Sequence, residues 1–455
     1  MSALVRHRDS IGETSLGMEE EEIAVRVENG RANPERTLRP IMYASWLLGV
    51  GVGRPKNSPK WMTMLIRAIH FAVCSVIVAF SAMDFADFGK EFTSELFEIM
   101  YCVNETGRHL AAYYYVYHII RHYDKWAELM EILERFDENV GKGSAPIDDR
   151  SVRIGQILAI LLVLLFGPIS LIAHVLYYYL TAPDQIFASD LLLYYTIAQT
   201  LINSFVFDIV VYAIRQRFRA IGETMGQSSN ERFGIYRIAS KIRRIRRLYN
   251  ELCCAVTTVN EIYGVDLLLC STNAFVLVVA KLFRIYMSAV ERKNGFIFLN
   301  NVIWMIYGGQ LVAMCWVCTL THREINKIGL CVSEFALNGN RETVVKSDQL
   351  ASSRNFWNEE PRQRLERAAT TTTTSSSSHC RSPIRDELND FSLELHRYRL
   401  AFTACDYFEM DNSLLTRVSE INRRKYSFVS VITTYLIILV QFYKPERYFG
   451  RAENE

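Results

Sequence analysis

The sequence lacks the features of a disulfide-rich domain and of the common hydrolase classes. Its 10 cysteines are scattered, several of them inside apolar stretches, and they form no disulfide framework. Cys315 and Cys318 have CxxC spacing but stand alone in a hydrophobic run, whereas a zinc site normally needs four ligands, so we expect no metal site. No HExxH, GxSxG or P-loop motif is present and the histidines do not cluster. We therefore expect neither an enzyme nor a cofactor.

Other absences narrow the class further. The first 40 residues are polar and contain no apolar segment followed by a cleavage site, so we see no signal peptide. The net charge is only +2, which does not indicate a nucleic-acid partner. A transporter would need internal symmetry and broken helices around a midplane site, and the sequence shows neither.

Long apolar segments dominate what is present. Half of the residues are hydrophobic, with 25 Phe and 24 Tyr among them. The segment 40–52 is too short and too rich in glycine to span a membrane, and we interpret it as a re-entrant or interfacial lead-in. The last apolar segment has 16 residues against the roughly 20 that a span needs. The predicted spans are Met62–Met83, Glu95–Ile120, Gly155–Leu180, Leu191–Ile214, Ile262–Val290, Phe296–Leu320 and Phe428–Tyr443.

The positive charges of the short loops predict the orientation. The loops Arg121–Arg153 and Arg215–Arg247 hold 16 Lys and Arg residues, whereas the three alternate loops hold 3. Because basic loops stay in the cytoplasm, the N-terminus is predicted to lie inside and the C-terminus outside. The fold class is therefore an all-α membrane protein with seven transmembrane helices in an inverted topology. The alternative for the loop Arg215–Arg247 is an anionic-lipid or nucleic-acid patch.

The last apolar segment carries polar residues at helical spacing. Thr434, Ile438 and Gln441 are spaced i, i+4, i+7, so a helix places them on one face, which should contact protein or water rather than lipid. Thr434-Tyr435, five apolar residues and then Gln441-Phe442 resemble the C-terminal signature of the insect gustatory receptor family. This resemblance implies a tetrameric, ligand-gated cation channel whose last helix lines the pore. It also implies a cytoplasmic helical anchor domain where subunits meet.

The predicted pore residues are Thr434, Ile438, Gln441 and Phe442. Gln441 could form a ring of amides, and Ile438 or a neighbour could close the pore by dewetting. Alternatively, Gln441 hydrogen-bonds to a neighbouring helix. The span contains no acidic residue that could form a charged ring, so we expect weak discrimination among cations.

Polar and aromatic residues in the outer halves of the spans predict a ligand site. Amides pair with adjacent hydroxyls of a polyol, and an aromatic face covers its C–H face. Asn300, Trp304 and Tyr307 share one face of the sixth span. The alternative is that such residues join helices or form interfacial belts. The candidate ligand-binding residues are Asn104, Arg108, His174, Tyr178, Gln199, Asn300, Trp304, Tyr307 and Gln310.

Within the family, the lead-in and the TTYLIILVQF ending resemble the fructose-sensing branch. That resemblance implies a sugar as the ligand and a multi-pass location in the plasma membrane. The expected partners are a small-molecule tastant, membrane lipid and further subunits, in a homotetramer or a hetero-oligomer with related receptors. An odorant receptor of the related insect family and a receptor for bitter compounds remain the alternatives.

A charged insert interrupts the C-terminal part of the sequence. A charged insert, Ser419–Ser427, separates the segment before the pore helix from the motif. It is either a cytoplasmic lead to a pore helix that starts after Lys425, or a gene-model artefact.

The expected organisation has five parts. They are a disordered cytoplasmic arm (1–38), helices one to five with cytoplasmic extensions (39–290), helix six with its cytoplasmic end (291–335), a disordered Ser/Thr-rich cytoplasmic loop (336–392) and the anchor segment with pore helix seven (393–455).

Overall fold

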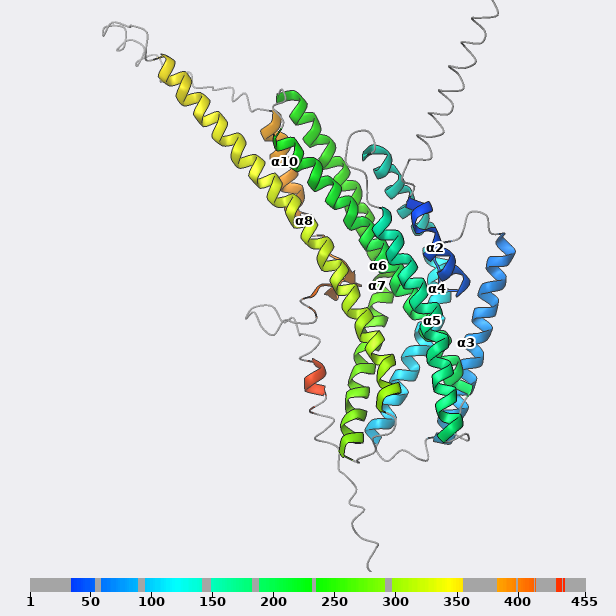
Figure 1. The fold of residues 1–455 in the computed structure, drawn as a ribbon. Coiled ribbons are helices and arrows are strands. Elements are labelled where there is room, and N and C mark those ends of the chain that lie inside the picture. The colour runs from blue at the N-terminus through cyan, green and yellow to red at the C-terminus, as the bar shows by residue number, and fades with distance from the viewer. Residues whose placement is uncertain are drawn as a thin grey trace, which may run out of the picture.

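The computed structural model describes the chain as a bundle of long helices (Figure 1). The described residues are 34–53, 59–88, 95–140, 149–181, 188–230, 235–290, 297–354, 383–397, 400–412, 414, 431–435 and 437. The elements are α2 Pro34–Leu47, α3 Lys60–Phe88, α4 Glu95–Val140, α5 Asp149–Thr181, α6 Ala188–Asn230, α7 Ile235–Val290, α8 Ile297–Arg354, α10 Pro383–Arg397, β1 Thr403–Ala404 and β2 Phe408–Glu409.

Helix α6 lies at the centre of the bundle. It packs against α5, α7 and α8, while α4 packs along α7. Of the apolar stretch Tyr194–Gly226 in α6, 78% is buried, against 22% and 24% for the apolar stretches of α3 and α5. A helix that is apolar all round is typical of such a central position. Phe207, Val211 and Ile214 on α6 are completely buried.

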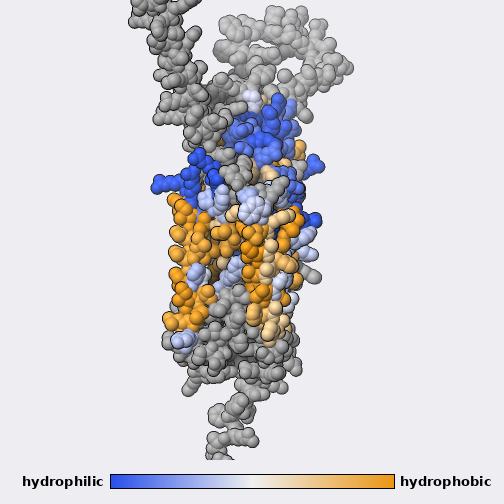
Figure 2. Space-filling model, turned by 90° about the vertical axis from the view of Figure 1, so that its right-hand side faces the viewer, coloured by the Kyte–Doolittle hydropathy of each residue, from blue (hydrophilic) through white to orange (hydrophobic). Residues whose placement is uncertain are grey.

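Helices α3 and α5 face outward with apolar side chains. Within the described residues, four stretches are long and apolar enough to cross a membrane, namely Trp61–Phe80, Arg150–Ile169, Tyr194–Gly226 and Ala239–Ala280. On the face that Figure 2 shows, hydrophobic residues form a broad belt, with hydrophilic residues gathered at one end of it. Exposed apolar surface of this extent is costly in water and favourable in lipid. The protein is therefore a membrane protein.

The apolar lead-in folds as α2 followed by a buried turn. Gly49 has a φ of 77°, and the amides of Gly49 and Val50 bond to the carbonyls of Trp46 and Ser45 at 3.0 and 3.1 Å. This is the Schellman ending of a helix, which favours glycine at the left-handed position. Val50 is completely buried, so the turn anchors the end of α2 inside the bundle.

Charged and aromatic contacts attach α10 to the extension of α7. Arg243 Nε bonds to Glu387 at 2.7 Å, Arg246 contacts Asp390 at 3.1 Å and Asn250 bonds to a Glu394 oxygen at 3.0 Å. The partners of each pair are 144 residues apart, so the two helices run parallel in constant register. On the inner face of α10, Leu388 and Phe391 are buried.

The helix bounds agree with most predicted spans but extend beyond them. α4, α6, α7 and α8 continue past the predicted spans by several turns. The structure differs from the expected disordered loop 336–392, because α8 continues to Arg354 and α10 begins at Pro383. It also begins α2 at Pro34, inside the expected arm 1–38. The insert Ser419–Ser427 lies outside the described residues.

Candidate functional site

A small polar cavity lies where α4, α6, α7 and α8 meet. It has a volume of about 20 Å³, which is room for little more than one water molecule. Tyr115 projects from α4 and Asn273 from α7, and Tyr307 comes from α8. The polar side chains around it are Tyr115, Thr196, Gln199, Thr200, Asn273 and Tyr307. The cavity is therefore lined by hydroxyl and amide groups from four helices together with Ala111, Leu269 and Cys270.

Two buried amide oxygens at this cavity have unmet hydrogen-bonding capacity. Gln199 is 1% exposed, and neither its Oε1 atom nor Oδ1 of Asn273 has a hydrogen-bond partner among the described residues. A buried acceptor without a donor costs about 1–3 kcal/mol. A ligand that donates hydrogen bonds would relieve both costs.

The other end of the Gln199 amide has a structural role. Its Nε2 atom donates to the carbonyl of Leu48 at 2.8 Å and lies 2.6 Å from Nδ1 of His70. The Leu48 carbonyl belongs to the buried turn after α2. Gln199 therefore joins α6 to the lead-in through its nitrogen and reaches the cavity through its side chain.

Two buried carboxylates lie deeper along α6 and α7. Asp208 accepts a hydrogen bond from Gln310 Nε2 at 2.8 Å, and Asp266 accepts one from Asn203 Nδ2 at 2.8 Å. All four side chains are buried. These pairs join α6 to α8 and to α7, because a polar group inside a membrane bundle is costly unless it has a partner.

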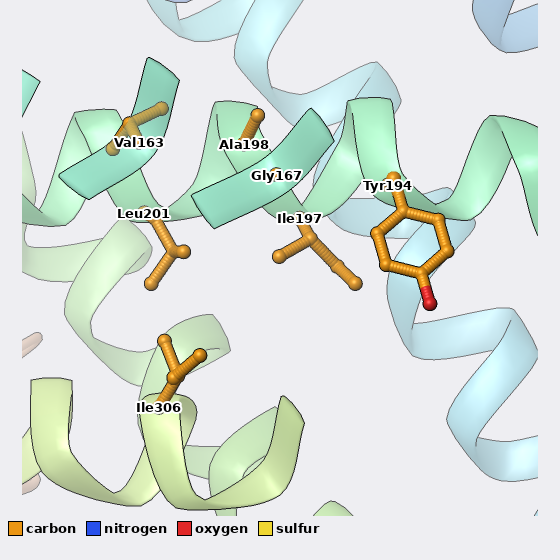
Figure 3. A pocket seen from close by; sticks show the side chains of 7 residues that line it. All are labelled: Val163, Gly167, Tyr194, Ile197, Ala198, Leu201 and Ile306. Atoms are coloured by element: carbon orange, nitrogen blue, oxygen red, sulfur yellow. The ribbon is translucent and has the colours of Figure 1, made fainter. Parts of the chain in front are cut away.

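A second small cavity lies between α5, α6 and α8 and is almost entirely apolar (Figure 3). Its volume is about 10 Å³. Figure 3 shows Leu201 of α6 and Ile306 of α8 pointing toward one another, with Gly167 of α5 beside them. Gly167 lines this cavity, and a Cβ atom there would meet nothing within 4 Å, so a larger side chain can be introduced at the edge of the cavity.

The hairpin β1–β2 connects α7 and α8 to the chain that leads to the predicted pore helix. Asn260 on α7 donates to the carbonyl of Ala401 at 2.8 Å and accepts from the amide of Thr403 at 3.2 Å. Thr319 on α8 accepts from the amide of Asn412 at 2.8 Å. Cys405 and Asp406 form the turn with positive φ, and Gly264 allows this turn to approach α7 because a Cβ there would lie 3.3 Å from Cys405 N. The hairpin is thus fixed to two helices.

A surface ion pair joins α4 to α7 at the residue that follows Asn260. Lys125 on α4 contacts Glu261 on α7 at 2.8 Å, and both side chains are about half exposed. The hydrogen bond from Lys125 to Glu261 raises the pKa of Lys125. An exposed pair of this kind contributes only about 0–1 kcal/mol.

The structure brings part of the predicted ligand set together. Gln199 and Tyr307 line the polar cavity, and Tyr307 and Gln310 line a smaller one beside it. Gln310 also bonds to Asp208. The ligand-binding role of these residues stays a prediction. The side chains of Asn104, Arg108, His174, Tyr178, Asn300 and Trp304 lie outside the described ones, although their backbones belong to α4, α5 and α8.

Only the start of the predicted pore helix is described. Thr434 lies in the helical stretch 431–435 and is exposed, and Tyr435 contacts Phe275 of α7 edge-on with ring centroids 5.6 Å apart. Ile438, Gln441 and Phe442 lie outside the described residues. Their pore role stays a prediction.

Several cavity residues were missed by the sequence analysis, among them Tyr115, Thr200 and Asn273. Asn273 carries a usable signal, since an amide inside the apolar run of α7 needs a partner. Asp208 offers the same signal inside the apolar run of α6. Tyr115 offers none, because the chain has many tyrosines in and around its spans.

Comparisons with known proteins agree with this architecture. The family model described as 7tm Chemosensory receptor matches residues 38–351 and 362–444. A Drosophila melanogaster protein named gustatory receptor 2a is 21% identical over 215 residues, and this match spans 46% of the chain and 43% of that protein. The matched region therefore covers less than half the length of that relative.

Two solved structures share the fold. The insect olfactory receptor OR5 of Machilis hrabei in complex with eugenol superposes with a TM-score of 0.55 at 11% identity, covering 90% of this chain and 98% of that one. The same receptor in a second structure gives a TM-score of 0.54 at 12% identity, with the same coverage. At these identities the likeness establishes the fold alone.

Proposed function

Because this chain belongs to the 7tm chemosensory receptor family, we propose that it is a gustatory receptor that acts as a ligand-gated, weakly selective cation channel. It is a receptor and not an enzyme, in agreement with the absence of hydrolase and P-loop motifs from the sequence. The proposed ligand is a small polar tastant such as fructose, and the proposed location is the plasma membrane. The single observation that carries the ligand class is the polar cavity with its two unpartnered amide oxygens.

The chemistry of the cavity suits a polyol. Amide oxygens accept from sugar hydroxyls, threonine and tyrosine hydroxyls both donate and accept, and tyrosine rings cover C–H faces. At about 20 Å³ the cavity is far too small for a hexose. Binding would therefore have to separate the helices that line it, and this separation is the proposed first step of gating.

The same helices connect the cavity to the hairpin before the pore segment. Asn273 and Asn260 both belong to α7, and Tyr307 and Thr319 both belong to α8. The first of each pair lines the cavity, whereas the second bonds to the hairpin region. A displacement of α7 against α8 at the cavity would thus shift the hairpin and the helix that follows it.

The assembly is proposed on the same grounds as the pore. Thr434, Tyr435 and Ile437 are exposed on a single chain, with Ile437 52% exposed. An apolar and polar helix face left open in this way suits contact with further subunits around a central pore, with Gln441 near the outer end. We propose a homotetramer or a hetero-oligomer of related receptors, in the inverted topology with the α10 end in the cytoplasm.

The apolar cavity supports a second ligand class. Its lining of Val163, Ile197, Leu201 and Ile306 would suit an apolar ligand, as in an odorant receptor or a receptor for bitter compounds. The related olfactory receptor was solved with eugenol. The two cavities thus predict opposite ligand preferences, and they can be altered separately.

The test records currents from cells that express the full chain, with fructose or eugenol applied outside. Asn273→Leu removes one unpartnered amide from the polar cavity, and Gly167→Leu adds a large side chain at the edge of the apolar one. We expect a fructose-evoked cation current without added G-protein. The half-maximal concentration should be about 5- to 150-fold higher in Asn273→Leu, since a lost buried hydrogen bond costs about 1–3 kcal/mol and each 1.4 kcal/mol is a factor of ten.

The Gly167→Leu variant should leave the fructose response unchanged. A response to eugenol alone, abolished by Gly167→Leu and insensitive to Asn273→Leu, would instead establish the apolar alternative. A fructose response that disappears when G-protein signalling is blocked would contradict the channel mechanism.

A further inference from the structure

Four arginines gather where α2 and α5 begin. Arg36 and Arg39 are exposed on the outer face of α2, whose opposite face buries Leu38, Ile41 and Met42. Arg150 and Arg153 are exposed in the first turns of α5. The first turn of α2 also contains an acidic residue, Glu35.

The two helices are held at a common level. Gln156 of α5, which is completely buried, donates from Nε2 to the carbonyl of Thr37 at 2.7 Å. Thr37 lies between Arg36 and Arg39, and Gln156 lies one turn after Arg153. The arginines of both helices therefore lie at the same end of two helices that pack against each other.

Apolar surface begins directly beyond the arginines on the same helices. On α5, Ile154, Ile157 and Leu158 are 56%, 55% and 64% exposed. On α2 the outer face continues through Tyr43, which accepts a hydrogen bond from Arg39 at 3.2 Å, to Leu47 at 67% exposed. On the face that Figure 2 shows, hydrophilic surface changes to hydrophobic surface at the edge of the belt.

The order of charged, aromatic and apolar side chains along these helices matches the change in polarity from the headgroups to the acyl chains of one membrane leaflet. Arginine binds phosphate through two parallel hydrogen bonds and keeps its charge at any physiological pH. Basic residues at the cytoplasmic surface attract anionic lipids. The aliphatic part of an arginine side chain can lie along apolar surface while its guanidinium group stays among the lipid headgroups.

We propose that Arg36, Arg39, Arg150 and Arg153 form a binding surface for the headgroup of an anionic phospholipid of the cytoplasmic leaflet. Its acyl chains lie along Ile154, Ile157 and Leu158 of α5. The assignment to the cytoplasmic leaflet rests on the proposed topology, but the binding itself can be tested without channel activity. The apolar surface next to the charges favours a lipid over a soluble anion.

The experiment uses the full chain in nanodiscs of phosphatidylcholine and measures binding of dioctanoyl phosphatidylserine. The variant Arg39→Gln/Arg153→Gln changes one exposed arginine on each helix. The matched control is Arg135→Gln/Arg219→Gln, which removes the same charge from arginines of the helix extensions that are 54% and 56% exposed. Thermal unfolding of each purified variant verifies that it is folded.

We expect the site variant to bind the anionic lipid on the order of 30-fold more weakly, from the typical effect of two arginines at an anionic surface. The control variant should bind dioctanoyl phosphatidylserine as the wild type does. Dioctanoyl phosphatidylcholine should bind to none of the three proteins. Equal binding by the site variant and the wild type would overturn the proposal. Complete competition by millimolar inorganic phosphate would overturn it too, because it would show an anion site rather than a lipid surface.

Discussion

The bonds between Asn260 and the hairpin give the sharpest test of how the segment before the predicted pore helix is positioned. Asn260→Leu keeps the approximate size of the side chain but removes its donor to Ala401 and its acceptor for Thr403. Each hydrogen bond contributes about 0.5–1.5 kcal/mol net, so the loss of both costs about 2 kcal/mol. The equilibrium for release of the hairpin from α7 should rise roughly 30-fold, at 1.4 kcal/mol for each factor of ten.

Hydrogen–deuterium exchange of the peptide that covers 400–412 measures this equilibrium. The Met410 amide, which bonds to the Phe402 carbonyl at 2.8 Å, reports opening of the hairpin itself. Local opening sets the exchange rate of such amides, so faster exchange should be confined to this segment. Glu261→Gln is the matched control, because it changes the neighbouring residue on α7 and breaks only an exposed ion pair.

The outcome also separates positioning from general destabilisation. If exchange at 400–412 is unchanged in Asn260→Leu, the two hydrogen bonds do not hold the hairpin, and the proposed route from the cavity to the pore segment loses its last connection. If exchange rises equally along the whole of α7, the substitution destabilises the bundle and not the hairpin attachment. Asn260→Asp should also speed exchange at 400–412, since it replaces the donor to the Ala401 carbonyl with a second acceptor that faces this carbonyl.

Two further predictions concern the stability of the bundle. Arg217 pairs with Asp137 through two hydrogen bonds, and the two side chains are 4% and 5% exposed. Arg217→Met leaves a buried carboxylate without this partner, so it should lower the free energy of unfolding by about 3–5 kcal/mol in thermal unfolding, and Arg217→Met/Asp137→Leu should recover much of the loss. An unchanged stability of Arg217→Met would contradict this. A Cβ at Gly53 would lie 2.5 Å from Met42 Cε and 2.6 Å from Trp126 Nε1, so Gly53→Ala should reduce the yield of folded protein in size-exclusion chromatography; an unaffected yield would show that this turn can move.

Local patterns in the sequence were enough for the class of fold. Helical segments follow from apolar length and periodicity, and the membrane character and the family follow from these segments and from the ending of the last one. These properties depend on neighbours in the chain or on the contrast between loops, so they can be read without the tertiary structure. The orientation and the number of spans are predictions of the same kind.

Contacts between distant segments could not be predicted in this way. Glu387 and Asp390 of α10 bond to Arg243 and Arg246, which precede them by 144 residues. The basic loop whose charges predict the topology therefore also binds α10. Asp208 and Gln310 are 102 residues apart, and their pairing assigns Gln310 a structural bond beside its predicted ligand role.

By itself the sequence determined an all-helical membrane receptor of the chemosensory family, because hydropathy and motif spacing are properties of contiguous residues. Only the tertiary structure decided which polar groups inside the bundle pair with one another and which are left to line a cavity. That choice depends on which helix faces come together, since an amide such as Asn273 has the same intrinsic chemistry whether it meets a partner or an open space.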